Sequence, residues 1–159
     1  MILSEKLQRE LEKVLSGRPW YGLPVYKIIE AVSFEAAYEK APGASHTIAE
    51  IVLHMVAWTE EVMDRMNGMT ASIPSSGDWP ETGTPSEQKW QSYVEDLKLV
   101  NVNLIGIIQN FPEEKWSEPV DDQRGTRPIF TYEELINGLM QHHIYHSGQI
   151  AILNRMING

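Results

Sequence analysis

Apolar residues recur at helical spacing in four long segments of this chain, and this pattern constrains the fold more than any other feature. The segments cover about residues 3–15, 47–66, 84–111 and 131 to nearly the C-terminus. Apolar residues three and four positions apart form one face of a helix, and such a face is normally buried against another element. No segment shows the strict alternation of β-branched residues that is typical of strands. The sequence therefore predicts an all-α protein.

Three of these segments begin with residues that favour the first turn of a helix. Each has a threonine followed three positions later by a glutamate, the pattern of a capping box. The pairs are Thr47 with Glu50, Thr84 with Glu87, and Thr131 with Glu134. Pro85 follows the second of these threonines, and proline is favoured at the first helical position. The pattern predicts helices that start at these threonines, and a shorter helical piece is expected over residues 25–38.

Four apolar helix faces are most simply buried together in an antiparallel four-helix bundle with long connections. The length of 159 residues fits one domain covering residues 1–159. The segment 68–84 is rich in Gly, Pro, Ser and Thr and is longer than a tight helix connection requires. It either covers a site or crosses the end of the bundle without a further role, and we favour the second interpretation.

Composition excludes several classes of protein. The 13 Lys and Arg against 22 Asp and Glu give a net charge of −9, which argues against binding to nucleic acid or to an anionic membrane. The chain has no cysteine, so a metal would be held by His, Asp or Glu. The sequence becomes charged after three residues and has no apolar stretch of membrane-spanning length. We therefore expect a cytoplasmic protein.

Two histidines lie at the centre of the apolar face of the last helical segment. His142 and His146 are four residues apart, which places them within about 40° of each other on a helix. Burying their ring nitrogens costs free energy unless each nitrogen finds a partner. A divalent metal ion bound by both side chains would serve, and so would hydrogen bonds to neighbouring helices. Both interpretations are open, and His143 lies at the shoulder of the same face.

A third histidine lies at the edge of the apolar face of the segment 47–66. Alone, His54 is more simply a boundary residue. Together with His142 and His146 it could complete a site of three histidines with open coordination positions, which is the mark of a catalytic metal site. His46 comes just before this helix, and we expect it at the surface.

Two stretches of the sequence resemble motifs of the DinB-like superfamily, a family of metal-binding four-helix bundles. Residues 142–150 resemble the HxxYHxGQI signature, and residues 45–58 resemble the second motif, a histidine followed by a tryptophan. Trp20-Tyr21-Gly22 and Asp78-Trp79-Pro80 also look like features of one branch. The resemblance covers nearly the whole chain in order, and its specific part is the C-terminal signature.

The resemblance implies that His54, His142 and His146 bind a divalent metal, with nickel or zinc expected first and manganese or iron as further candidates. Relatives include transferases that use low-molecular-weight thiols such as bacillithiol or mycothiol. The resemblance therefore implies a metal-dependent thiol S-transferase, with hydrolase as the older generic assignment. A non-catalytic metal-binding stress protein is the alternative. Family members also often pair, so a homodimer is expected, and no general base is identified.

Six residues near these motifs have more modest interpretations. We favour packing for Trp58, Tyr145 and Gly148, helix capping for Glu50, and solvent exposure for Glu61. Gly148 would allow close approach of another helix. For Gln149, a role beside the site and a hydrogen bond across the bundle are equally open.

Overall fold

The computed structural model describes residues 2–159, which are helical apart from their connections. The helices are α1 (Leu3–Ser16), α2 (Val25–Glu30), α3 (Phe34–Tyr38), α4 (Ile48–Met66), α5 (Glu87–Asn110) and α6 (Tyr132–Asn158), with a 3₁₀ turn at Glu113–Lys115. Within this part of the chain no strand forms, and a single isolated bridge joins Pro119 to Thr131. The all-α prediction is confirmed.

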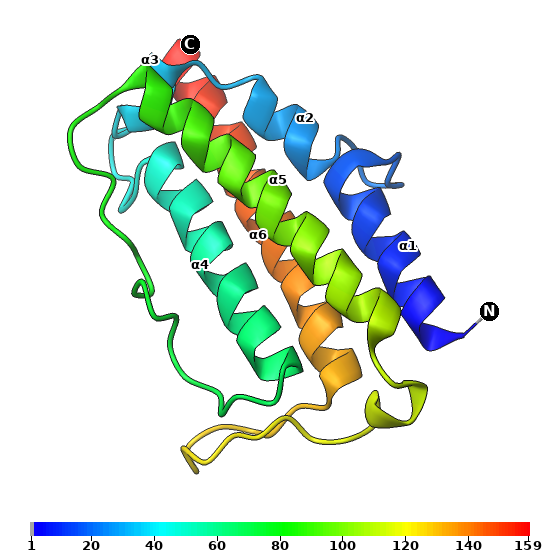
Figure 1. The fold of residues 1–159 in the computed structure, drawn as a ribbon. Helices are drawn as coiled ribbons and strands as arrows, with labels where there is room; N and C mark the ends of the chain where they lie inside the picture. Colours follow the sequence, from blue (N-terminus) through cyan, green and yellow to red (C-terminus); the bar gives the residue numbers. More distant parts are fainter. Residues whose placement is uncertain (1) are drawn as a thin grey trace.

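The four long helices α1, α4, α5 and α6 form the bundle. Figure 1 shows α1 and α6 running in one direction and α4 and α5 running in the other. Helix α4 packs against both α5 and α6, and α1 also packs against both. Each long helix therefore has one antiparallel and one parallel neighbour.

The parallel pair α4 and α5 explains the long connection between them. The 19 residues of α4 rise by about 28 Å, and the chain must travel back along this length before α5 can start. Figure 1 shows this connection running along the side of α4. The expectation that residues 68–84 cross the end of the bundle is wrong. A connection can cross one end only when the two helices that it joins are antiparallel, and α4 and α5 are parallel.

Hydrogen bonds at the helix starts confirm two of the three predicted capping boxes. The Thr47 and Thr131 side chains each accept a hydrogen bond from the glutamate backbone N–H three residues later. Helix α5 starts later than expected, because the hydroxyl of Ser86, not of Thr84, accepts from the backbone N–H of Lys89. The helical piece expected over residues 25–38 is divided in two, because Ser33 caps a new helix by accepting from the Ala36 N–H.

The core lies between the four long helices. Leu11, Met55, Leu104 and Ile136, one from each long helix, are fully buried at 0% exposure. Trp116, from the connection after α5, closes one end of this core and donates its indole N–H to the Ser4 hydroxyl at 2.9 Å. Among the described helices, none is both long enough and apolar enough to cross a membrane.

Candidate metal centre

Helix α6 carries two of the three predicted metal ligands. His142 and His146 are one turn apart on the side of α6 that packs against α4, and their ring centroids are 4.4 Å apart. His146 is only 5% exposed, and His142 is half-buried. The apolar face around the pair keeps α6 against the bundle, so both imidazoles are held at the α4–α6 contact.

Helix α4 brings the third predicted ligand to the same place. His54 is 6% exposed, and its ring centroid lies 5.0 Å from that of His142 and 4.7 Å from that of His146. Each of the three residues offers a ligand atom, and these atoms lie within 4.8 Å of one another. The Nε2 atoms of His54 and His142 are 3.1 Å apart. Two nitrogens bound to one tetrahedral zinc are separated by about 3.3 Å, so this spacing fits a shared ion.

Hydrogen bonds at the other ring nitrogens leave Nε2 available on two of the imidazoles. His54 Nδ1 donates to the backbone carbonyl of Asp78 at 2.5 Å, and His146 Nδ1 donates to the side-chain Oε1 of Gln149 at 2.7 Å. A histidine whose Nδ1 carries the proton presents the Nε2 lone pair. Such partners also fix the orientation of metal-binding imidazoles. Gln149 therefore lies beside the site and bonds to His146 of its own helix, and it does not form the alternative hydrogen bond across the bundle to any described residue.

The third imidazole has a buried nitrogen without a partner. His142 Nδ1 forms no hydrogen bond with any described residue. Nothing at this nitrogen fixes which ring nitrogen of His142 carries the proton, so this imidazole can present Nε2 to an ion. The three side chains therefore fit a divalent metal by donor type and by spacing, and the outer nitrogens of His54 and His146 have hydrogen-bond partners of the kind that hold metal-binding imidazoles.

Burial keeps all three imidazoles neutral near pH 7. Burial is the largest cause that lowers the pKa of His142 to about 3, and the neighbouring imidazoles lower it further. Burial also lowers the pKa of His54 and of His146 below the ordinary value. Only the neutral imidazole offers a lone pair to a metal. The site is therefore in its ligating form at neutral pH.

The connection between α4 and α5 covers one side of this cluster. The Trp79 indole is stacked between the rings of His54 and His46, with centroid distances of 3.8 Å and 3.6 Å. Asp78 accepts from His54 through its carbonyl and, at 2.7 Å, from the Trp58 indole N–H through its carboxylate. The connection thus covers the site, contrary to our favoured expectation. His46 is half-buried under Trp79 and not simply a surface residue.

Three packing interpretations are also wrong. Trp58 is half-buried and stands beside His142, with ring centroids 6.5 Å apart, so it forms a wall of the site. Tyr145 is 64% exposed and meets the His146 ring edge to face. A Cβ atom added at Gly148 would meet nothing within 4 Å, so this glycine does not serve the close approach of another helix.

Glu50 and Glu61 of α4, which lie near the edge of the helix that carries His54, have structural roles. Glu50 completes the capping box with Thr47 as predicted, and its carboxylate also binds His46. Glu61 is buried at 4% exposure, contrary to expectation, because it pairs with Arg65 and accepts from the backbone N–H of Ser72 at 3.0 Å. Glu61 therefore anchors the start of the covering connection and does not reach the histidines.

His143 lies outside the cluster. It is 0% exposed, and its Nε2 donates to Oδ1 of Asn101 at 3.1 Å. The Asn101 amide in turn donates to the Leu97 carbonyl, which fixes the orientation of the amide. His143 is thus a core residue, and no feature of the sequence indicated Asn101 as its partner.

Two hollows flank the histidine cluster along the groove between α4 and α6. The His142 hollow has a volume of about 450 Å³, and its lining includes Trp58, Val62, Phe130, Leu135, Leu139 and His142. The His146 hollow has a volume of about 540 Å³, and its lining includes Ser45, His46, Trp79, Tyr145, His146 and Gln149. The two hollows share no lining residue, so two different groups could approach the cluster at once.

Comparisons with known proteins agree with this arrangement at the level of family and fold. The sequence profile of the DinB superfamily matches residues 25–150. The crystal structure of a DinB-like protein (YjoA) from Bacillus subtilis is similar, with a TM-score of 0.63 and 18% sequence identity. The match covers 97% of this chain and 93% of that chain. No curated protein matches the sequence.

Proposed function

This chain belongs to the DinB superfamily, and from that premise we propose that it binds a divalent metal ion at His54, His142 and His146 and acts as a metal-dependent S-transferase of a low-molecular-weight thiol. One observation carries the proposal: three neutral imidazoles place their ligand atoms close together, and hydrogen bonds at Nδ1 orient the rings of His54 and His146. Three protein ligands leave coordination positions open, which distinguishes catalytic from structural sites.

A bound ion would lower the pKa of a thiol and so supply a thiolate near neutral pH. In the transfer, the thiol releases its proton to solvent and its sulfur forms a bond to an electrophilic carbon. The bond from that carbon to the leaving group breaks, and the leaving group takes the electron pair. Neutral imidazoles do not reduce the charge of the ion, which favours this chemistry.

Side chains around the site orient the imidazoles and cover one side of the histidine cluster. Asp78 and Gln149 hold two of the imidazoles through their Nδ1 atoms. Trp79 covers the His54 ring and excludes water from that side of the cluster. The Asp78 carboxylate already accepts from Trp58, and the proposal assigns no general base.

A panel of reactions tests the proposal. Protein without an affinity tag is loaded separately with zinc, nickel, manganese or iron and mixed with 1-chloro-2,4-dinitrobenzene and cysteine, glutathione, coenzyme A or bacillithiol. We expect thiol conjugation above the background of metal and thiol alone. The His142→Ala, His146→Ala double variant should fall to background, whereas Arg155→Ala, an exposed change on the same helix, should keep the rate.

Other outcomes would overturn the transferase proposal. Hydrolysis of a chromogenic ester that needs the metal but no thiol would assign the site to a hydrolase. Metal binding without turnover for any thiol or ester would assign the chain to the non-catalytic metal-binding proteins.

A further inference from the structure

We propose that the His142 hollow binds an aromatic group of the electrophilic substrate, with Trp58 and Phe130 as the residues that determine specificity, while the thiol approaches from the His146 hollow. This assignment rests on the proposed transferase function. It follows from the side chains that line the two hollows, which lie on either side of the same histidine cluster.

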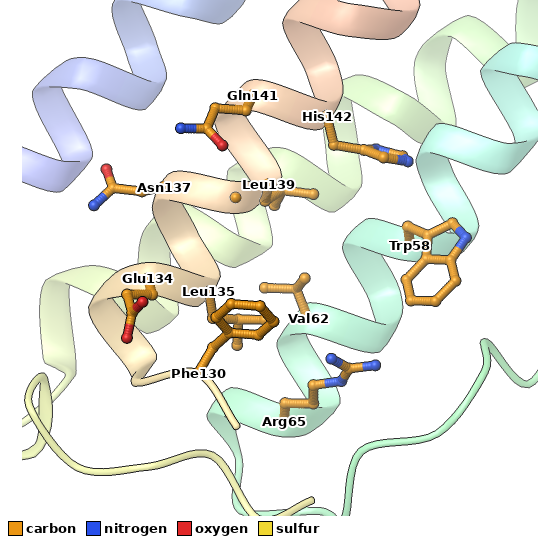
Figure 2. Close-up of a pocket in the computed structure, with 11 residues that line it drawn as sticks. Trp58, Val62, Arg65, Phe130, Glu134, Leu135, Asn137, Leu139, Gln141 and His142 are labelled. Atoms are coloured by element: carbon orange, nitrogen blue, oxygen red, sulfur yellow. The ribbon is translucent and has the colours of Figure 1, made fainter. Parts of the chain in front are cut away.

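The His142 hollow has aromatic and aliphatic side chains on facing walls, and Arg65, Glu134, Asn137 and Gln141 complete its polar edge. Figure 2 shows His142 and Trp58 on one side and Phe130 with Leu135 on the other, with Val62 between them. Its volume of about 450 Å³ lies in the range of small-molecule sites and is ample for one aromatic ring with substituents. Because His142 lines the hollow, a group bound there would lie beside one of the three proposed metal ligands.

Trp58 is fixed in an orientation that presents its ring to the hollow. Its indole N–H is already bound to the Asp78 carboxylate at 2.7 Å, so the polar atom of the side chain is satisfied outside the hollow. The Arg65 guanidinium lies 5.8 Å from the centre of the Trp58 ring. A ring held in this way provides a stacking surface at little further cost in side-chain entropy.

Phe130 gives the hollow an exposed apolar edge. This side chain is 50% exposed, and the neighbouring Ile129 is 57% exposed. An aromatic group between Phe130 and Trp58 would remove apolar surface from water and gain the favourable geometry of aromatic pairs.

The charged side chains that line the hollow favour an uncharged group over an anion. Arg65 is paired with Glu61, and it also donates to the Ser72 carbonyl at 2.9 Å. The Glu134 carboxylate accepts from the backbone and the hydroxyl of Thr131. Arg65 is therefore not free to bind an anion, and Glu134, an acidic side chain bonded to uncharged groups of Thr131, disfavours one.

The His146 hollow offers partners for a polar cosubstrate. His46, Tyr145 and Gln149 all line it and carry groups that can form hydrogen bonds. Low-molecular-weight thiols carry amide, carboxylate or hydroxyl groups beside the sulfur, and these need such partners. The two reactants would thus meet at the ion from opposite ends of the α4–α6 groove.

Fluorobenzene is a suitable probe, because its ¹⁹F signal reports binding without any reaction. Gly138 lines the His142 hollow, and a Cβ added there meets nothing within 4 Å, so Gly138→Leu adds a side chain to the lining from an unobstructed position. Gly148→Leu is the matched control on the same helix, because a Cβ added there also meets nothing within 4 Å and Gly148 belongs to neither lining. Both changes replace a helical glycine and therefore favour the helix.

We expect fluorobenzene to bind the zinc-loaded protein and its fluorine to relax faster when cobalt replaces zinc. Gly138→Leu should weaken binding by at least about tenfold, and Gly148→Leu should change it by less than about twofold. Absence of binding, or equal weakening by both changes, would overturn the assignment. Metal content and thiol turnover are measured on the same samples. Turnover without fluorobenzene binding overturns only this inference, whereas binding without turnover overturns the transferase function.

Discussion

The Gln149→Leu variant removes the hydrogen bond that orients one of the three metal ligands. Gln149 accepts from His146 Nδ1 at 2.7 Å through its side-chain Oε1. Leucine has nearly the same volume and cannot accept a hydrogen bond, so the packing around His146 is largely kept. The change therefore isolates the effect of the outer partner on metal binding.

The expected size of the effect follows from the strength of this hydrogen bond. Metal binding at Nε2 withdraws electrons from the ring and makes the Nδ1 proton a stronger donor, so the bond resembles one to a charged group. Such bonds contribute about 1.5–3 kcal/mol, which corresponds to a loss of about 10- to 100-fold in affinity. The same range is typical when an outer partner of a metal-bound histidine is removed.

Competition with a chromogenic chelator measures the zinc dissociation constant of each variant. Gln149→Leu should raise this constant by about 10- to 100-fold, and Gln149→Glu should lower it, because a carboxylate is the stronger acceptor. Gln109→Leu is the control, since Gln109 is an exposed glutamine on α5. If Gln149→Leu binds zinc as tightly as the unmodified protein, His146 is not a ligand held in the proposed way.

Three further predictions concern the cover, the core and the assembly. Trp79→Ala removes the ring stacked between His46 and His54. An aromatic pair contributes about 1 kcal/mol, so EDTA should extract bound metal about fivefold faster from this variant. An unchanged extraction rate in a stopped-flow assay would contradict this prediction. Burial lowers the pKa of His143 to about 4, so the unfolded chain takes up this proton first as the pH falls. His143 should therefore contribute about 3 kcal/mol of stability that is complete above pH 6.5 and is lost towards pH 4. Urea titrations of the metal-free protein and of His143→Gln should diverge in this window, and parallel curves would refute the assignment. Leu99 and Val102 of α5 are exposed apolar residues, so we expect a homodimer by sedimentation velocity; a strict monomer at high concentration would exclude it.

The helices could be predicted because their signals are local. Thr47 and Thr131 cap helices through bonds to residues three positions away, so the pattern and its cause lie in one turn. The i, i+4 spacing of His142 and His146 is equally local, and it placed both imidazoles on the buried face. The start of α5 was predicted two residues too early, because Thr84 and Ser86 are both good caps and only the path of the preceding connection selects Ser86.

The covering connection could not be predicted in the same way. The contacts of Asp78 and Trp79 with His54 join residues more than twenty positions apart, and no periodicity marks such contacts. They depend on α4 and α5 being parallel, which sends the connection back along α4. The Asp-Trp-Pro sequence in a polar segment was the one available sign, since a tryptophan in an otherwise polar loop needs a surface to cover. The partner of His143 was hidden for a similar reason, because Asn101 comes from another helix.

Elemental analysis of the purified protein, made without an affinity tag, tests the central claim most directly. The protein is incubated with nickel, zinc or manganese, freed of excess metal, and compared with the His142→Ala, His146→Ala double variant. If the three histidines form a metal site, the unmodified protein holds about one divalent ion per chain and the double variant holds none. No metal in the unmodified protein under any condition, or equal metal in both proteins, would show that these histidines do not form a metal site.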